Sequence, residues 1–139
     1  MAVRVLDLPP ERAFRLVTAL DQHGRWVPLT RVTAPSGLPR DGDVVVARTG
    51  GLFVDRMRVE RVAPPHELVL AKLGPVLLGR ATITVTPADG DRARVSWTYD
   101  ARLRGPLPAR SLLGRLLEAM AALAMWRMAR WARRTRPAR

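Results

Sequence analysis

The chain has 139 residues and no cysteine, which excludes disulfide bonds, thiolate metal sites and a thiol nucleophile. Its formal net charge is +12, but residues 1–101 hold 14 basic and 11 acidic side chains, whereas residues 102–139 hold ten and one. Because the positive charge is concentrated at the C-terminal end, a nucleic-acid groove across the whole fold is excluded. The length predicts a single domain over 1–139, with 135–139 as a frayed basic tail.

No stretch approaches the roughly 18 consecutive apolar residues that a membrane-spanning helix needs. The N-terminus also lacks the apolar core of a signal peptide, so we expect a cytoplasmic protein. Only one of the 24 basic residues, Lys72, is a lysine. We interpret this imbalance as coding bias and not as recognition chemistry.

The N-terminal quarter predicts a strand, a helix, a short helical turn and a second strand. Alternation over 3–7 indicates the first strand. Pro10 and Glu11 favour the start of a helix, because proline is accepted in the first turn and an acidic side chain there complements the helix dipole. Residues 23–28 predict a turn or short helix, and 29–34 predict a weakly patterned edge strand.

The middle of the chain predicts an antiparallel sheet made of hairpins. The dipeptides Gly50-Gly51 and Asp89-Gly90 are typical of tight hairpin turns. The flanking runs alternate apolar and polar residues, which is typical of a sheet with one face on the core and one in water. The expected strands are 43–49, 52–62, 67–73, 78–87 and 92–103. With the two N-terminal strands they make seven.

A long C-terminal helix is expected from about Ala109 to Arg134. At 100° per residue, one of its faces carries a continuous apolar stripe. The members of this stripe are Leu113, Leu117, Met120, Ala124, Met128 and Trp131, with Leu116 and Leu123 on its flank. A stripe of this length needs a broad partner. We therefore predict an α+β fold in which a curved antiparallel seven-stranded sheet wraps around the C-terminal helix, with a cavity between them.

Several short motifs occur in an order that spans nearly the whole chain. They are Pro10-Glu11-Arg12-Ala13-Phe14, Asp21 with Trp26 and Pro28, Asp41-Gly42-Asp43, Asp55, Pro64-Pro65, Gly79-Arg80-Ala81 and Val95-Ser96-Trp97. Together they resemble the START/Bet v 1-like (SRPBCC, helix-grip) superfamily, especially its small bacterial polyketide cyclase/dehydrase-like members. The resemblance implies a hydrophobic-ligand cavity between sheet and helix. It does not imply a reaction, since members include lipid carriers, hormone receptors, cyclases and co-chaperones.

Asp55 is the sharpest candidate for chemistry. It shares a strand face with Phe53, Met57 and Val59, so strand parity places its carboxylate on the apolar side of the sheet. A carboxylate there must be paired, protonated or near water. Asp55 is therefore either an acid, base or acceptor inside the cavity, or a solvated group near the rim, close to the Gly-Gly turn. If the protein is an enzyme, Asp55 and Tyr99 are the expected catalytic residues.

Arg127 falls inside the apolar stripe of the long helix. It either meets an acid or an anionic ligand group, or extends out of the stripe toward solvent. The two histidines, His23 and His66, lack the spacing of a metal site and are expected to be ordinary loop residues. We expect no metal and no cofactor.

We expect the protein to bind or carry a hydrophobic small molecule or lipid in the cavity. The residues expected to contact this ligand are Trp26, Phe53, Met57, Val59, Ile83, Val85, Trp97, Leu113, Leu117, Met120 and Arg127. One alternative is a polyketide cyclase/dehydratase-like enzyme that uses Asp55, and whether the protein is an enzyme stays open. A second alternative is contact with an anionic membrane or a nucleic acid through the Arg/Trp-rich C-terminal end. The oligomeric state also stays open.

Overall fold

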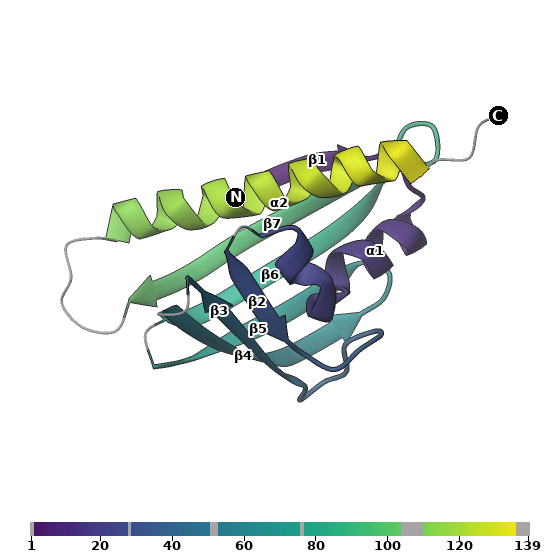
Figure 1. Ribbon diagram of the computed structural model, residues 1–139. Coiled ribbons are helices and arrows are strands. Elements are labelled where there is room, and N and C mark those ends of the chain that lie inside the picture. The colour runs from purple at the N-terminus through teal and green to yellow at the C-terminus, as the bar shows by residue number, and fades with distance from the viewer. Residues whose placement is uncertain (1, 28, 51–52, 76, 104–109, 136–139) are drawn as a thin grey trace.

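The computed structural model describes residues 2–27, 29–50, 53–75, 77–103 and 110–135 (Figure 1). The strands are β1 (Ala2–Leu6), β2 (Thr30–Thr33), β3 (Val44–Thr49), β4 (Phe53–Ala63), β5 (Glu67–Pro75), β6 (Leu77–Ala88) and β7 (Arg92–Leu103). The helices are α1 (Pro10–Thr18), the 3-10 helix η1 (Leu20–Arg25) and α2 (Arg110–Thr135). The predicted strands and helices are thus confirmed, with ends that differ by a few residues.

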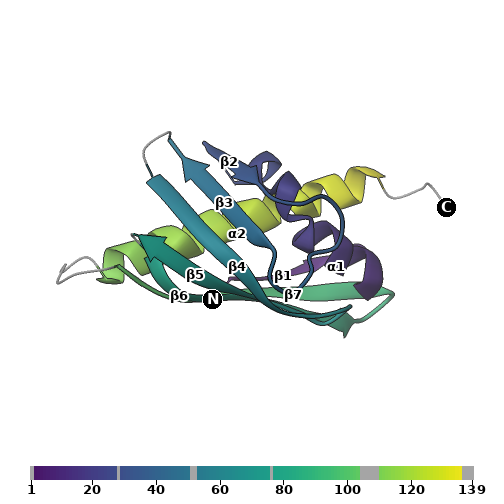
Figure 2. The ribbon, with the colours of Figure 1, turned by 90° about the horizontal axis from the view of Figure 1, so that it is seen from below.

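The seven strands form one antiparallel sheet in the order β1-β7-β6-β5-β4-β3-β2. Strands β2 to β7 follow one another as neighbours, and β1 joins the edge beside β7. The sheet is curled into a half-barrel with α2 along it, which confirms the predicted helix-grip α+β fold (Figures 1 and 2). At the β6–β7 hairpin, where Ala88 pairs with Arg92, Gly90 has a φ of 68°, a left-handed conformation that glycine adopts without strain.

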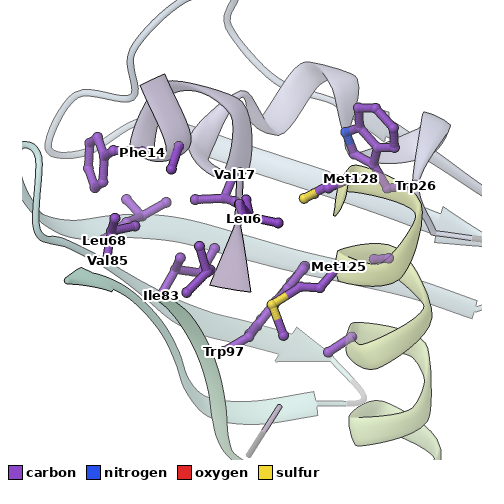
Figure 3. Packing of buried hydrophobic residues seen from close by; sticks show 14 of the residues in the cluster. Leu6, Phe14, Val17, Trp26, Leu68, Ile83, Val85, Trp97, Met125 and Met128 are labelled. Atoms are coloured by element: carbon purple, nitrogen blue, oxygen red, sulfur yellow. The ribbon is translucent and has the colours of Figure 1, made fainter. Parts of the chain in front are cut away.

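The hydrophobic core fills one end of the half-barrel, where α1 packs against β6 and β7. Phe14 and Val17 of α1 face the sheet there, and Figure 3 shows them with Ile83 and Val85 of β6. Both residues of β6 are fully buried because the alternation of the strand turns them toward the helices.

The buried face of α2 differs from the predicted stripe. Ala124 and Met128 are buried as expected, but Met120 and Trp131 are only half-buried and Leu116 is 56% exposed. The buried residues of α2, among those described, are Ala121, Ala124, Met125, Met128, Ala129 and Ala132. Alanines allow α2 to lie close to β1 and β7, because interaxial distance depends on the side chains at the contact. The predicted stripe therefore shares Ala124 and Met128 with the buried face and lacks Ala121, Met125, Ala129 and Ala132.

Candidate functional site

A pocket of about 290 Å³ lies between the concave face of the sheet and the first half of α2. Strands β2 to β7 and η1 supply its walls, and Leu116 and Met120 contribute from α2. Most of the lining is aliphatic or aromatic. The volume is at the low end of the range for small-molecule sites, which is about 300–1,000 Å³. The geometry therefore suits a small apolar molecule better than a large lipid.

The pocket begins where the core ends along β6 and β7. Ile83 is paired with Trp97. The next inward pair in the direction away from the core is Ala81 with Tyr99. Ala81, Trp97 and Tyr99 line the pocket, whereas Ile83 does not. The small side chain of Ala81 leaves space that a larger residue would fill, which is one reason the cavity opens here.

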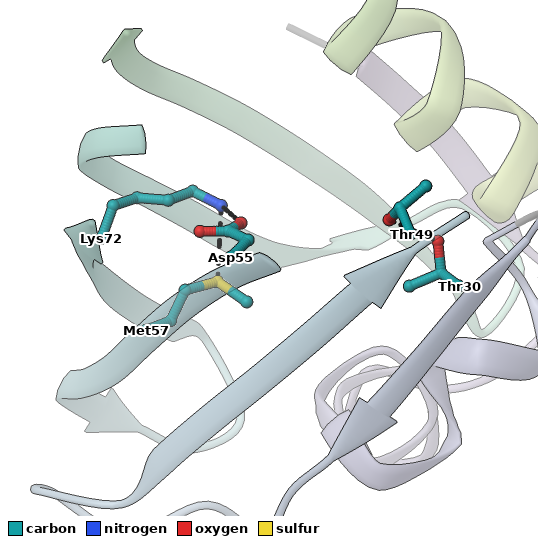
Figure 4. A network of polar contacts seen from close by, with 5 residues as sticks. All are labelled: Thr30, Thr49, Asp55, Met57 and Lys72. Carbon is teal, nitrogen blue, oxygen red and sulfur yellow. Dashed lines mark hydrogen bonds and ion pairs between the residues drawn. The ribbon is translucent and has the colours of Figure 1, made fainter. Parts of the chain in front are cut away.

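A buried ion pair lies in the pocket wall. The Lys72 ammonium donates to Oδ2 of Asp55 and to the sulfur of Met57, 3.4 Å away, as Figure 4 shows. Lys72 is 7% exposed and Asp55 8%. The other carboxylate oxygen of Asp55, Oδ1, is buried and has no hydrogen-bond partner in the described part of the chain. An unmatched buried acceptor is rare in proteins and marks a place where another donor fits.

The pairing of β4 with β5 brings Lys72 to Asp55. Lys72 lies opposite Met57, and Gly74 opposite Arg56, so one residue of β5 is left over at this point. This register shift is a β-bulge, a feature that re-aims side chains next to functional sites. Lys72 shares the inward face of β5 with Leu68 and Leu70, which are both buried.

Three rings form a row along the wall and end at the ion pair. The ring centres of His23 and Trp97 are 5.4 Å apart, and those of Trp97 and Tyr99 are 5.8 Å apart. The Lys72 ammonium lies 5.3 Å from the centre of the Tyr99 ring. Burial, with a smaller contribution from the charge of Asp55, raises the pKa of Tyr99 above its ordinary value, so its phenol stays neutral. The indole nitrogen of Trp97 is a buried donor without a partner among the described residues.

His23 lies in η1, is buried and lines the pocket. The expectation that it is an ordinary loop residue is therefore wrong. Its Nε2 lies 2.7 Å from the carbonyl oxygen of Val17. Because a carbonyl only accepts, the hydrogen is assigned to Nε2. Burial lowers the pKa of His23, so the ring is neutral near pH 7. His66, in contrast, lies in the exposed turn between β4 and β5.

The residues predicted to contact a ligand fall into four groups, of which Arg127 and Trp26 form the last. Met57, Trp97 and Met120 line the pocket, and so do the two candidate catalytic residues. Those that belong to the core instead are Val59, Ile83 and Val85. They point to the same face of the sheet, but the core end of the half-barrel buries them. The side chains of Phe53, Leu113 and Leu117 lie outside the described residues.

Arg127 and Trp26 contact each other and not the pocket. The Arg127 guanidinium donates to the backbone carbonyl of Trp26, with 3.2 Å between the two atoms. The Trp26 ring is buried, 6.2 Å from the ring of Trp131. The cation beside Asp55 is therefore Lys72, and Arg127 meets a backbone carbonyl in place of an acid. Arg127 is partly buried and satisfies a main-chain acceptor where η1 meets α2.

Among the pocket residues that the sequence prediction missed, Lys72 and His23 are the ones with titratable side chains. The parity of β5 carried a signal for Lys72, because it stands two positions after Leu70 in a run whose even positions point inward. The single lysine had been attributed to coding bias. His23 had no comparable signal in the sequence, since η1 is too short for a helical periodicity to be recognised.

The residues that the structure describes contain no group of three histidines, aspartates or glutamates placed to hold a metal ion. None of the described helices is long and apolar enough to cross a membrane.

Residues 2–132 match a protein family described as polyketide cyclase / dehydrase and lipid transport. No curated protein sequence matches the chain. Among solved structures, an NMR structure from Thermobifida fusca has a TM-score of 0.73 at 22% identity, covering 99% of this chain and 94% of that chain. A START superfamily protein from Mycobacterium smegmatis has a TM-score of 0.74 at 15% identity, with coverages of 93% and 94%.

A third similar structure is DynU16, from the dynemicin biosynthetic locus. It has a TM-score of 0.68 at 17% identity, over 94% of this chain and 45% of that chain. At identities this low, likeness between structures establishes the fold and not the activity.

Proposed function

The chain belongs to the START/Bet v 1-like family described as polyketide cyclase / dehydrase and lipid transport, and from this premise we propose that it binds a hydrophobic small molecule in the pocket between the sheet and α2. The observation that carries the proposal is the apolar pocket itself, of about 290 Å³, with one buried ion pair in its wall. An apolar pocket with a few convergent polar groups is the usual form of a small-molecule site.

The apolar body of the ligand would lie against Val45, Leu70 and Met120, which line the pocket on three elements. Burying such a body is favourable by about 25 cal/mol for each Å² of apolar surface removed from water. The stacked rings of Trp97 and Tyr99 offer a flat surface beside it. Hydrophobic contact would therefore supply the affinity, and the ion pair would orient one end of the ligand.

Mass spectrometry of organic extracts from the purified protein tests the proposal. Ala47 lines the pocket from β3, so Ala47→Phe is expected to fill it and to remove a co-purifying hydrophobic molecule. Val46→Phe places the same ring on the opposite face of β3 and serves as the matched control. The same molecule at equal occupancy in both variants would show that binding occurs elsewhere.

A second candidate function is a cyclase or dehydratase that uses Asp55 as its base. The unpartnered Oδ1 of Asp55 in the pocket wall favours it, because proton transfer needs a titratable group within hydrogen-bond reach of the substrate. Tyr99 lines the same pocket and would donate a hydrogen bond to a carbonyl group. If turnover of a polyketide is detected, Asp55→Asn should abolish it in a folded variant. Retained turnover would contradict this role.

A further inference from the structure

We infer that the pocket selects neutral molecules that carry a hydroxyl group over molecules with the same apolar body that carry a carboxylate. The inference rests on the proposed binding function and names the polar group of the ligand. It follows from three observations on the pocket wall: the charges there cancel, the unmatched charged atom is an acceptor, and the remaining polar side chains are neutral.

The charged side chains among the described lining residues are Asp55 and Lys72, and they are paired with each other. The Lys72 ammonium also donates to the sulfur of Met57 and faces the ring of Tyr99. The described residues of the pocket wall therefore present no unmatched positive charge to an acidic ligand. A carboxylate that enters such a site loses its hydration without gaining a counter-ion, which is costly in a low-dielectric interior.

The unmatched atom of the pair is an oxygen. Oδ1 of Asp55 is buried and has no partner in the described part of the chain, so a donor from the ligand would complete its hydrogen bonding. A hydroxyl group supplies that donor, and a hydrogen bond to a charged acceptor is roughly twice as strong as one between neutral groups. A ligand carboxylate at the same place would bring two negative oxygens together.

The other polar groups do not reverse this preference. The Trp97 indole nitrogen is a neutral donor without a described partner, and the buried His23 and Tyr99 are neutral. One neutral N–H does not offset the desolvation of a carboxylate. It can donate to a hydroxyl or carbonyl oxygen of a neutral ligand, which favours the same class of molecule.

Three probes with one apolar body test the inference: butylbenzene, 4-butylphenol and 4-butylbenzoate, titrated calorimetrically into the full chain at pH 7. Butylbenzene reports hydrophobic binding alone. We expect 4-butylphenol to bind about tenfold more tightly than 4-butylbenzoate, since one charge-assisted hydrogen bond is gained and one unpaired charge avoided. Benzoate binding as tightly as the phenol would overturn the inference, and this comparison needs no variant.

Asp55→Asn provides the sharper test. It keeps an oxygen acceptor but leaves the Lys72 ammonium without its counter-ion, so the phenol-to-benzoate preference should shift toward benzoate by about tenfold or more. Glu60→Gln is the matched control, because Glu60 lies on the outer face of the same strand in an exposed pair with Arg80. An unchanged preference in Asp55→Asn, or an equal shift in Glu60→Gln, would overturn the inference. Failure of all three probes to bind would instead reject the proposed function.

Discussion

Lys72 on β5 donates its ammonium to the carboxylate of Asp55 on β4, and both side chains are almost excluded from water. The pair forms part of the pocket wall, so the single lysine of the chain neutralises an acid that would otherwise be buried alone. Buried pairs contribute little net stability relative to apolar residues of the same shape, but removing one partner is expensive. The same two residues therefore bear on the stability of the fold and on the proposed ligand preference.

Lys72→Met is expected to lower the free energy of unfolding by about 3–5 kcal/mol, because it leaves the Asp55 carboxylate buried without a counter-ion. The double variant Asp55→Leu/Lys72→Met should recover most of this loss. Urea denaturation measures both effects. Arg80→Met breaks the exposed pair with Glu60 and should leave the midpoint nearly unchanged. A Lys72→Met midpoint equal to that of the unaltered chain would contradict the pairing.

Trp97→Ala is expected to destabilise the protein by about 3 kcal/mol or more, because it removes a large ring that is 6% exposed. Trp126→Ala is the matched control, since that ring is 38% exposed and should cost less than about 1 kcal/mol. Urea melts with an unchanged slope and a shifted midpoint would report the difference. Equal midpoints for the two variants would mean that Trp97 does not support the core.

His23 should make stability depend on pH between 5 and 7. Burial lowers its pKa below the ordinary value of about 6.5, so the unfolded chain binds the proton first as the pH falls. The contribution of His23 is therefore complete above about pH 7 and declines below it, by at most about 1.4 kcal/mol per pH unit.

Urea midpoints measured from pH 5 to pH 7.5 test this dependence. The slope of stability against pH should flatten in His23→Gln. It should persist in His66→Gln, because His66 is exposed. The same slope in His23→Gln as in the unaltered chain would place the titrating group elsewhere.

We propose that the C-terminal end makes a weak contact with anionic membranes. Trp126 is partly exposed, and the Arg130 guanidinium lies 4.9 Å from the centre of its ring. Each basic residue near an anionic surface contributes about 1 kcal/mol, which salt screens. Co-sedimentation with vesicles that contain phosphatidylserine should therefore be weak and disappear at high salt.

Two double variants that each remove two positive charges separate this contact from a general attraction between the positively charged protein and the membrane. Arg130→Gln/Arg133→Gln should reduce sedimentation more than Arg31→Gln/Arg48→Gln, which removes two exposed charges from β2 and β3. Equal reductions would indicate attraction by net charge alone. Strong binding at high salt would show that the contact is not electrostatic.

The sequence alone determined the elements and, for the strands at 52–62, 78–87 and 92–103, the face to which the residues point. Alternation in 78–87 and 92–103 placed Ile83, Val85 and Trp97 inward, and the structure buries all three. The long C-terminal helix also followed from local periodicity. These properties depend on neighbours within a few positions, so a single sequence carries them.

Only the tertiary structure decided which inward residues line a pocket and which form the core. Val59 and Asp55 have the same parity on β4, yet the first is packed in the core and the second lines the pocket. The positions of α1 and α2 over the sheet make this difference, and strand parity carries no information about those positions. The partner of Asp55 was decided in the same way, because the β4–β5 register sets Lys72 opposite Met57 and next to Asp55, while Arg127 donates to the carbonyl of Trp26.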